Sequence, residues 1–474
     1  MTRTTSDTTA RHMSHALQSA IAGDVFVPGD DGYDNARRAY YLNVDQRPAV
    51  AVLAESAADV VEAVQFARAN GLRIAPQSTG HGASPLEPLE DAILLKTSRM
   101  RRVEIAAATR IARAEAGAEW REVTIPAAEH GLAALAGTSA NVGVTGYTLG
   151  GGIGWLSRRY GLAANSVTAA EVVTVDGRLA HVDAGHEPDL FWAVRGGGGS
   201  VGVVTALEMA LFPVRELYAG ALFFPIERSS EMLSAWREWT DTLPDEVTSI
   251  ARILRVPELP EAPEPMRGRG FALVEAAYLG DALRGAELLQ PLRVLGPELD
   301  TFTTIPAPAL QALHMDPVDP VPAEADGALL SAFGAGAIDA VVRLVGPDAE
   351  TSLASLEVRR LGGALARNAA SGGAQAKIDA EFVIFAAGLA ATPELGDAVR
   401  AQARAVKEAL TPWRAAYDYY NLAETPAGAN AVLPHDAYLR LREIKAHYDP
   451  DQAIISAHPV QPAGAEMSTT AVGS

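Results

Sequence analysis

The sequence predicts an α+β protein with more than one domain, and three observations support this. The chain has 474 residues, 48% of them hydrophobic, so it can bury a large core and is long enough for roughly two or three domains. Strand and helix patterns alternate near its start, over residues 49–76. From about residue 216 strands and helices are separated by proline-rich stretches such as VPELPEAPEPM, which indicates a second domain with long surface loops.

The first predicted elements form an alternating set. Residues 49–53 are apolar and predict a short strand. A helix follows, because Ser56 is a favourable N-cap, valines and alanines recur at helical spacing, and Gly71 is a favourable C-terminal residue. A second strand, residues 72–76, leads into the sequence QSTGHGA.

Two glycine-rich runs come next, GTSANVGVTGYTLGGGIG from residue 137 and RGGGGSVG at residues 195–202. Between them, apolar stretches flank Asp176 and Gly177, a pair that is typical of a two-residue hairpin turn. This part of the chain is therefore predicted to contain two antiparallel strands.

The second glycine run satisfies the pattern G-x-G-x-x-G, which in dinucleotide-binding proteins opens a helix whose N-terminus faces the pyrophosphate. The segment after it places Val203, Leu207 and Met209 on one alternating face and predicts a strand. Because a strand follows instead of a helix, the pattern is not a Rossmann fingerprint. No GK[ST] ending is present, which excludes a P-loop.

Charge and composition narrow the range of partners. A formal net charge of −19 argues against nucleic acid, which is bound through clustered Lys and Arg, and against an anionic membrane surface. The N-terminus lacks the apolar core of a signal peptide, and no apolar run approaches the roughly 20 residues of a membrane span. We expect a cytoplasmic monomer or homodimer that binds a small molecule.

The chain contains no cysteine, which excludes disulfides, thiolate metal sites and redox dithiols. Redox chemistry would therefore need a cofactor. His314, His435 and Glu381 show no metal-ligand spacing and are expected at the surface or on a pocket wall; no metal is predicted.

Glycines mark three places where backbone can approach a ligand closely: Gly80 and Gly82 around His81, residues 143–154, and residues 196–202. Amide groups without a neighbouring Cβ can converge on phosphate oxygens, so three such loops can wrap an extended dinucleotide. A single loop of this kind would be interpreted as an ordinary turn.

The order of these motifs is specific. Three motifs follow one another in this order: STGH, GxxxxVGxxGxxLGGGxGxxxxxYG and DLFWAVRGGGGSVGVVT. In these motifs the chain resembles the vanillyl-alcohol oxidase and p-cresol methylhydroxylase superfamily of FAD proteins, in particular its berberine-bridge-enzyme-like branch. The C-terminal YYN and the segment IKAHYDPDQ are similar to the closing part of that branch. The resemblance covers residues 43–458 and is weakest over residues 216–350.

The resemblance implies a two-part FAD-binding domain of the p-cresol methylhydroxylase (PCMH) type with an inserted substrate domain made of an antiparallel sheet and helices. The FAD-binding domain is expected over residues 35–215 and the substrate domain over 216–400. A C-terminal segment, 401–465, is expected to return to the FAD-binding domain. We expect a mobile lead-in, 1–34, and a flexible tail, 466–474.

The resemblance also implies a covalent cofactor. His81 matches the histidine that is joined to the 8-methyl carbon of the flavin, although by itself it could be a simple loop histidine. Ser139 occupies the position of a cysteine that bonds flavin C6 in many relatives. A single covalent bond between protein and flavin is therefore expected, and the pocket is expected to be more open at the C6 edge of the flavin ring. The other residues expected to bind FAD are Gln77, Ser78, Thr79, Gly80, Gly82, Thr138, Ser139, Val142, Gly143, Gly146, Gly151, Gly202, Val203, Val204 and Asn421.

Three further residues have roles implied by the resemblance. Val142 stands where a small aliphatic residue goes with oxidase behaviour, although it could also be a buried core valine. Tyr419 matches the Y-x-N motif and could take a proton from a substrate hydroxyl if nearby charge lowered its pKa, or it could simply pack. Ile153 departs from the aromatic residue of several relatives, so Tyr147 could supply the hydroxyl instead.

The predicted function is that of an FAD-dependent oxidase. It would move a hydride from a small organic substrate, an alcohol, sugar or specialised metabolite, to flavin N5, with dioxygen reoxidising the flavin and giving hydrogen peroxide. Two alternatives stay open: a dehydrogenase of the same fold with another acceptor, and a flavin-containing protein that sequesters a toxic small molecule.

Overall fold

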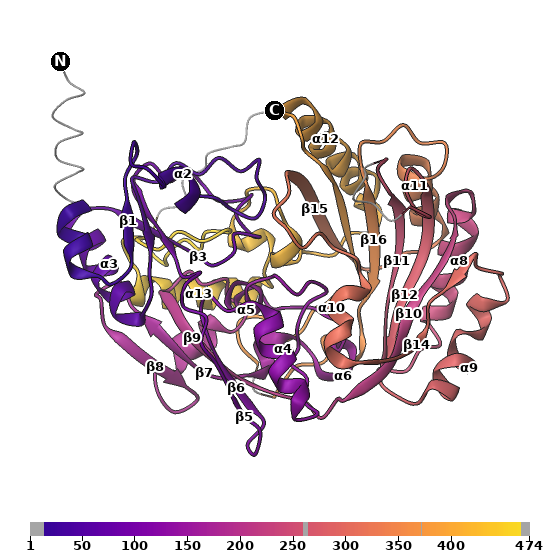
Figure 1. Cartoon of the computed structure of the whole chain (residues 1–474), viewed down its shortest axis with the longest axis horizontal. Coiled ribbons are helices and arrows are strands. Elements are labelled where there is room, and N and C mark those ends of the chain that lie inside the picture. The colour runs from indigo at the N-terminus through magenta and orange to yellow at the C-terminus, as the bar shows by residue number, and fades with distance from the viewer. Residues whose placement is uncertain (1–13, 259–263, 371, 466–474) are drawn as a thin grey trace.

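A computed structural model describes residues 14–258, 264–370 and 372–465 of the chain. The structure has two lobes that lie side by side (Figure 1). We call them the N-terminal lobe, built from residues 14–215 and 414–465, and the sheet lobe, built from the described residues between 216 and 413. The sheet lobe is therefore an insertion between the two parts of the N-terminal lobe.

The N-terminal lobe contains a four-stranded sheet in the order β1-β2-β4-β3, in which β1 is antiparallel and the other neighbours are parallel. Its strands are β1 (Asp24–Phe26), β2 (Val50–Leu53), β3 (Arg73–Gln77) and β4 (Ala92–Lys96). Helix α3 (Ala57–Asn70) connects β2 to β3 as predicted: Ser56 Oγ accepts the amide hydrogen of Asp59, and Gly71 is left-handed, with φ 66°.

The structure differs from the predicted lead-in of residues 1–34. Residues 14–20 are helical, Leu17 is 1% exposed, and β1 extends the sheet. The Asp59 carboxylate accepts hydrogen bonds from the amides of Ala22 and Gly23, which fixes the segment. β1 has only three residues, too few to show an alternating pattern. Residues 1–13 and the predicted tail, 466–474, lie outside the described residues.

A five-stranded antiparallel sheet, in the order β5-β6-β9-β7-β8, completes the N-terminal lobe. Its strands are β5 (Val103–Ala106), β6 (Ile111–Glu115), β7 (Val167–Val173), β8 (Leu179–Asp183) and β9 (Val203–Ala210). The predicted hairpin at Asp176 and Gly177 joins β7 to β8, and β9 is the strand predicted after the second glycine run. Both predictions are confirmed.

One detail of β9 was predicted wrongly. Its pairing with β7 shifts register between Glu171 and Val172, so an extra residue is inserted in β9. Val203 therefore packs in the core of the four-stranded sheet, whereas Leu207 and Met209 pack in the core of the five-stranded sheet. The three residues do not share one face.

The sheet lobe is built on eight antiparallel strands, in the order β13-β10-β12-β11-β16-β17-β15, with β14 also paired to β10. The strands are β10 (Glu216–Pro225), β11 (Val247–Arg255), β12 (Gly270–Tyr278), β13 (Leu299–Asp300), β14 (Thr303–Pro306), β15 (Ala323–Leu330), β16 (Ser355–Arg360) and β17 (Phe382–Leu389). This matches the predicted antiparallel sheet with helices.

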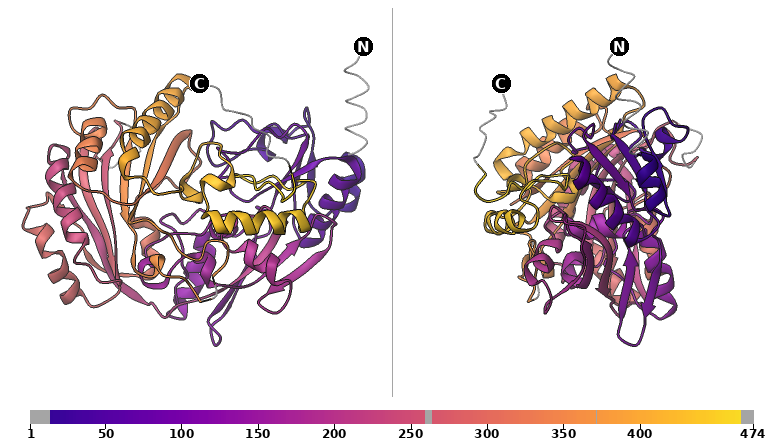
Figure 2. Two further views of the ribbon diagram at one scale, coloured as in Figure 1. Left: turned by 180° about the vertical axis from the view of Figure 1, so that it is seen from behind. Right: turned by 90° about the vertical axis from the view of Figure 1, so that its left-hand side faces the viewer.

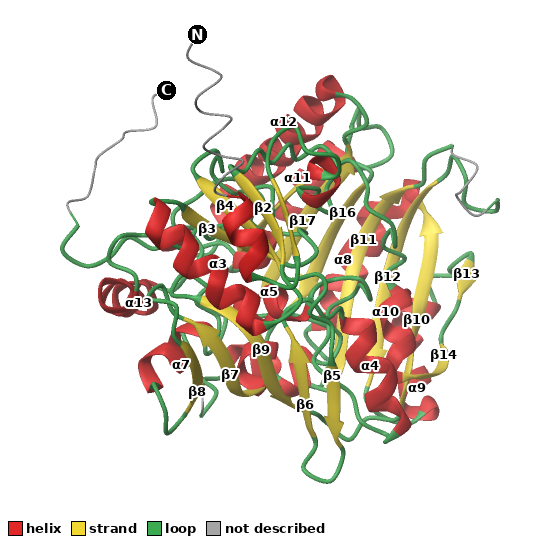
Figure 3. Cartoon of the chain, turned by 60° about the vertical axis from the view of Figure 1, so that its left-hand side comes forward, coloured by secondary structure: helices red, strands yellow, loops and turns green. Residues whose placement is uncertain are grey.

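Four helices share an apolar core with one face of this sheet. They are α8 (Ser229–Thr240), α9 (Ala282–Arg293), α11 (Ala335–Val345) and α12 (Pro393–Ala409). Figures 1 and 3 show them on the outer side of the sheet, so its other face turns toward the N-terminal lobe. The predicted domain boundary at residue 400 falls inside α12, which packs on β15 and β17, so the sheet lobe extends to about residue 413.

The C-terminal segment returns to the N-terminal lobe. Helix α13 (His435–Tyr448), predicted over residues 438–447, contacts α7 (Pro188–Val194) and runs across the lobe (Figure 2). The remaining short helices are α2 (Tyr33–Ala36), α4 (Trp120–Glu129), α5 (Val144–Leu149), α6 (Ser157–Tyr160) and α10 (Leu310–Leu313).

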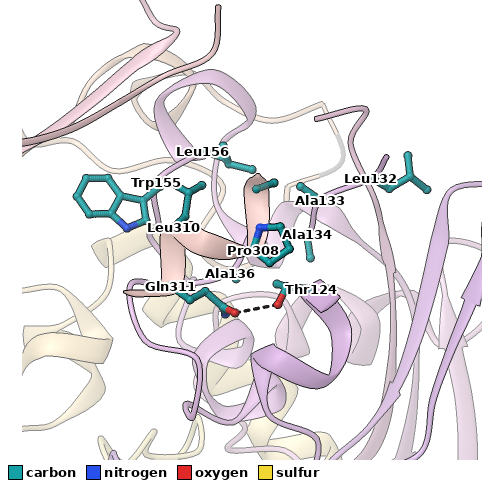
Figure 4. A pocket seen from close by; sticks show the side chains of 12 residues that line it. Thr124, Leu132, Ala133, Ala134, Ala136, Trp155, Leu156, Pro308, Leu310 and Gln311 are labelled. Carbon is teal, nitrogen blue, oxygen red and sulfur yellow. Dashed lines mark hydrogen bonds between the residues drawn. The ribbon is translucent and has the colours of Figure 1, made fainter. Parts of the chain in front are cut away.

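Apolar side chains join the two lobes. Leu135 and Trp155 pack with Leu217 and Leu310 of the sheet lobe. Figure 4 shows a small pocket in this interface, about 20 Å³, where Thr124 Oγ1 donates a hydrogen bond of 2.8 Å to Gln311 Oε1. This volume has room for about one water molecule and none for an organic ligand.

Candidate active site

The lobes enclose a cavity of about 1060 Å³. Its N-terminal-lobe wall comes from the loops of residues 77–82, 137–146 and 198–204. Its opposite wall is the inner face of the eight-stranded sheet, because alternate side chains of a strand point to the same side. Those side chains are Arg252 and Leu254 of β11, Ser355, Glu357 and Arg359 of β16, and Val383, Phe385, Ala387 and Leu389 of β17.

The glycine loops have the features that a dinucleotide requires. A Cβ placed on Gly82 or Gly146 would meet no atom within 4 Å, so both residues expose backbone to open space. Ser78 Oγ and Thr145 Oγ1 are buried on the cavity wall without a hydrogen-bond partner among the described residues. Glycine backbone with open space in place of a Cβ, beside unpaired hydroxyls, suits a pyrophosphate, so this site fits FAD.

His81 belongs to the loop of residues 77–82 and lines the cavity. Its ring stacks on Tyr40, with ring centroids 3.7 Å apart, and its Nδ1 lies 2.7 Å from Thr79 Oγ1. Burial lowers the pKa of His81 to about 3. The imidazole is therefore neutral at physiological pH and keeps a lone pair on one ring nitrogen.

The expectation of open space beside Ser139 is wrong. Asp316, from the loop after α10, fills this position: its Oδ2 accepts a hydrogen bond from Ser139 Oγ and another, of 3.2 Å, from Thr138 Oγ1. The proline-rich stretch that contains Asp316 was predicted to be a surface loop. Part of it instead forms a cavity wall.

Tyr147, Tyr419 and Asn421 meet at another part of the wall. Asn421 Nδ2 donates to the carbonyl oxygen of Tyr147, at 2.8 Å, and contacts Tyr419 Oη at 3.4 Å. Burial raises the pKa of both tyrosines above the usual value, so their hydroxyls stay protonated. This direction does not favour either tyrosine as a proton acceptor.

Four residues of the sheet, Arg252, Glu275, Glu357 and Arg359, form a buried ionic cluster with His314 from the end of α10. His314 lies between two carboxylates, with Nδ1 2.5 Å from Glu275 Oε2 and Nε2 2.8 Å from Glu357 Oε2. Arg359 donates to Glu357 Oε1 at 2.6 and 2.9 Å, and Arg252 Nη1 lies 3.6 Å from Glu275 Oε1.

The charges in this cluster depend on one another. Burial opposes the charge on His314, but the carboxylates, above all Glu275, outweigh it and raise the pKa of His314 to about 9. Burial also opposes the charge on Glu357, but Arg359 and His314 hold its pKa below the usual range. At neutral pH His314 is therefore protonated and forms an ion pair with the ionised Glu357.

Most residues predicted for the site line the cavity. They are Gln77, Ser78, Thr79, Gly80, His81, Gly82, Thr138, Ser139, Val142, Gly143, Gly146, Tyr147, Gly202, Val204, Tyr419 and Asn421. Val203 is instead fully buried in the core, and the space beside Gly151 is filled by Gln375 and Tyr419. These two residues lie behind the wall.

Sequence reasoning missed Tyr40, Asp316, Glu357, Arg359 and Glu424, all of which line the cavity. The alternation of Ser355, Glu357 and Arg359 in a strand pattern was a usable signal for a polar wall. His314 was expected on a surface or pocket wall and lies on the cavity wall, 5% exposed.

Two further searches cover only the described part of the chain. No group of three or more His, Asp or Glu residues there has a metal-binding arrangement. None of the helices there has the length and apolarity needed to cross a membrane.

Comparisons with known proteins agree with this geometry. A family model described as "FAD binding domain" matches residues 48–183. The FAD-linked oxidoreductase YvdP of Bacillus subtilis is 30% identical over 314 residues, which are 65% of this chain and 67% of that protein.

Two relatives with named activities match over shorter segments. (R)-6-hydroxynicotine oxidase of Paenarthrobacter nicotinovorans is 35% identical over 206 residues, 43% of this chain and 45% of that protein. Glucooligosaccharide oxidase of Sarocladium strictum is 31% identical over 245 residues, 50% of this chain and 49% of that protein. The chain thus spans about half the length of each of these enzymes in the match.

Solved structures share the fold. 6-Hydroxy-D-nicotine oxidase of Arthrobacter nicotinovorans superposes with a TM-score of 0.76, 23% identity, and coverage of 91% of this chain and 96% of that one. A variant of berberine bridge enzyme superposes with a TM-score of 0.80 and 18% identity, with coverage of 95% of this chain and 99% of that one. Wild-type Phl p 4, a pollen protein described as a glucose dehydrogenase, superposes with a TM-score of 0.80 and 20% identity, with coverage of 95% of this chain and 99% of that one. Its isoleucine-to-valine variant, described as a glucose oxidase, has a TM-score of 0.80 and 19% identity, with the same two coverages.

The order of the glycine motifs, the two-lobed fold, the cavity between the lobes and these matches all agree. The chain belongs to the FAD-linked oxidoreductases, and it shares its fold with 6-hydroxy-D-nicotine oxidase and berberine bridge enzyme.

Proposed function

We propose that the protein is an FAD-dependent oxidase that takes a hydride from a small alcohol, sugar or specialised metabolite and passes the electrons to dioxygen. The observation that carries this proposal is the continuous cavity, about 1060 Å³, which joins the glycine loops to the inner face of the sheet. It has room for a bound cofactor and a substrate stacked between the two lobes.

We further propose that FAD is attached through His81 by a single bond. Support comes from the imidazole, which is neutral at physiological pH, and from the loop glycines beside it. A second bond from a cysteine is ruled out by the composition of the chain. Ser78, Thr79 and Thr145 would bind the pyrophosphate and ribityl parts through their hydroxyls.

When bound, the flavin supplies the hydride acceptor at N5. We propose that Tyr147 and Tyr419 act on the substrate as hydrogen-bond donors, because both hydroxyls stay protonated and both residues line the cavity. Leu254 and Phe385 line the same cavity on the sheet side. A substrate with an apolar ring and one polar end matches this distribution.

Dioxygen is the proposed electron acceptor because Val142 lines the cavity at the position assigned by resemblance to oxygen access. The Phl p 4 pair supports the principle that one methylene separates the two behaviours, since its valine variant is described as an oxidase and its wild type as a dehydrogenase. A dehydrogenase with another acceptor is the second candidate.

The test uses (R)-6-hydroxynicotine, a glucooligosaccharide and benzyl alcohol as probes. Each is mixed with the purified protein without oxygen while the flavin absorbance is followed, and then with oxygen while hydrogen peroxide is measured. We expect bleaching followed by peroxide with at least one probe. Bleaching without peroxide would identify a dehydrogenase, and stoichiometric binding without bleaching would identify the sequestering protein.

A further inference from the structure

Among the described residues, three carboxylates line the cavity: Asp316, Glu357 and Glu424. Glu357 is committed to the ionic cluster, because one oxygen faces His314 and the other accepts from Arg359. Burial raises the pKa of Glu424 to about 8, so that carboxyl group is protonated at neutral pH. Neither is suited to receive a proton from a substrate.

Asp316 has a different environment. Among the described residues, its Oδ2 accepts hydrogen bonds from the hydroxyls of Thr138 and Ser139. Its Oδ1 makes a long ion pair with His314 Nε2, at 3.9 Å, but accepts no hydrogen bond from it, and the side chain is 29% exposed. One carboxylate oxygen is therefore oriented by the protein while the other can accept a proton.

The loop that carries Asp316 is fixed at several points. Arg252 Nη1 donates to the His314 carbonyl oxygen at 2.6 Å, and Tyr40 Oη donates to the Pro317 carbonyl oxygen at 2.6 Å. Asn141 Nδ2 donates to the Val318 carbonyl oxygen, also at 2.6 Å. These bonds reach the loop from both lobes, so the carboxylate is positioned before any ligand binds.

We propose that Asp316 is the proton acceptor of the reaction, held by Ser139 beside the flavin. This rests on the proposed function and on the expectation that the flavin lies along Thr138 and Ser139. As the substrate C–H bond breaks and its hydride passes to FAD, the substrate O–H or N–H bond breaks and its proton passes to Asp316 Oδ1. The electron pair of that bond forms the C=O or C=N bond of the product, and the proton later leaves to solvent.

The test compares Asp316→Asn with Asp319→Asn. Both remove one carboxylate charge from the same loop, but Asp319 is exposed and does not line the cavity. With the probe that bleaches the wild-type flavin, we expect the anaerobic rate of reduction in D316N to fall by roughly 10²-fold or more, the usual contribution of a proton acceptor. D319N should match the wild type.

Sulfite gives a second measurement that needs no turnover. Sulfite adds to an oxidised flavin as an anion, so a negatively charged carboxylate beside the flavin lowers the affinity for sulfite. Removing that charge in D316N should lower the sulfite dissociation constant by about ten-fold, and D319N should leave it unchanged.

The outcomes separate the two proposals. Equal reduction rates in wild type and D316N, or equal sulfite affinities, would overturn the role of Asp316. Failure of every probe to bleach the wild-type flavin would contradict the proposed function. A tighter sulfite complex in D316N would then still support the position of Asp316 beside the flavin.

Discussion

At the scale of single residues, Val142 is expected to decide which acceptor takes the electrons. Val142→Ile adds one methylene on the cavity wall, where dioxygen would approach. We predict that reoxidation of the reduced flavin by dioxygen slows roughly ten-fold, equivalent to about 1.4 kcal/mol of barrier, while anaerobic reduction is unchanged. Stopped-flow absorbance measures both rates.

Val256→Ile is the matched control, because Val256 lines the same cavity from the end of the sheet. It should leave reoxidation as in the wild type. If reoxidation slowed equally in both variants, the cause would be general crowding of the cavity. If V142I did not slow reoxidation, Val142 would have no role in oxygen access.

His314 gives the fold a dependence on pH. Its pKa is about 9 in the buried ionic cluster, against roughly 6.5 in an unfolded chain. A group whose pKa is raised on folding stabilises the folded protein fully at a pH below its pKa in the unfolded chain. This stabilisation is lost as the pH rises through the pKa of the group in the folded protein. Its contribution is therefore complete near pH 6, about 3 kcal/mol, and is lost by about pH 10.

Urea unfolding of the wild type and of His314→Gln at these two pH values measures this contribution. The difference in unfolding free energy between the two proteins should be larger at pH 6 than at pH 10. His435→Gln, at an exposed position, is the control and should show no such change. A difference that does not vary with pH would contradict a protonated His314.

At the scale of an element, the loop of residues 314–322 joins the lobes through its carbonyl groups. Asn141→Ala removes its hydrogen bond to Val318, so local opening should become easier by about 1 kcal/mol. We predict that the amides of this loop exchange hydrogen about five-fold faster, as measured by mass spectrometry.

Asn165→Ala serves as the comparison, because Asn165 donates to the Ala376 carbonyl oxygen, on another segment. It should leave exchange in residues 314–322 unchanged. If N141A also leaves that exchange unchanged, the loop is held by its other contacts, and the pre-positioning of Asp316 does not depend on Asn141.

At the scale of the whole molecule, the parts that local chemistry determines were predictable from the sequence. Ser56 and Gly71 define α3 because capping depends on the residues themselves. The strand after the second glycine run excluded a Rossmann site and is present as β9. The glycines around His81 marked a loop that lines the cavity, for the same local reason.

Features that depend on distant partners were not predictable. Glu275, His314 and Glu357 come from β12, a loop and β16, and nothing in their spacing shows that they meet. The side to which Val203 points depends on a bulge against β7, so strand alternation alone gave the wrong face. Asp316 lies in a proline-rich stretch whose composition is typical of an exposed loop.

The most direct test of this account is mass spectrometry of the denatured, trypsin-digested protein. Cleavage after Arg73 and Lys96 releases residues 74–96, a peptide whose single histidine is His81. We predict that this peptide carries the mass of FAD less two hydrogens, and that no other peptide carries flavin. An unmodified 74–96 peptide, with intact FAD released into solution, would contradict the covalent attachment through His81.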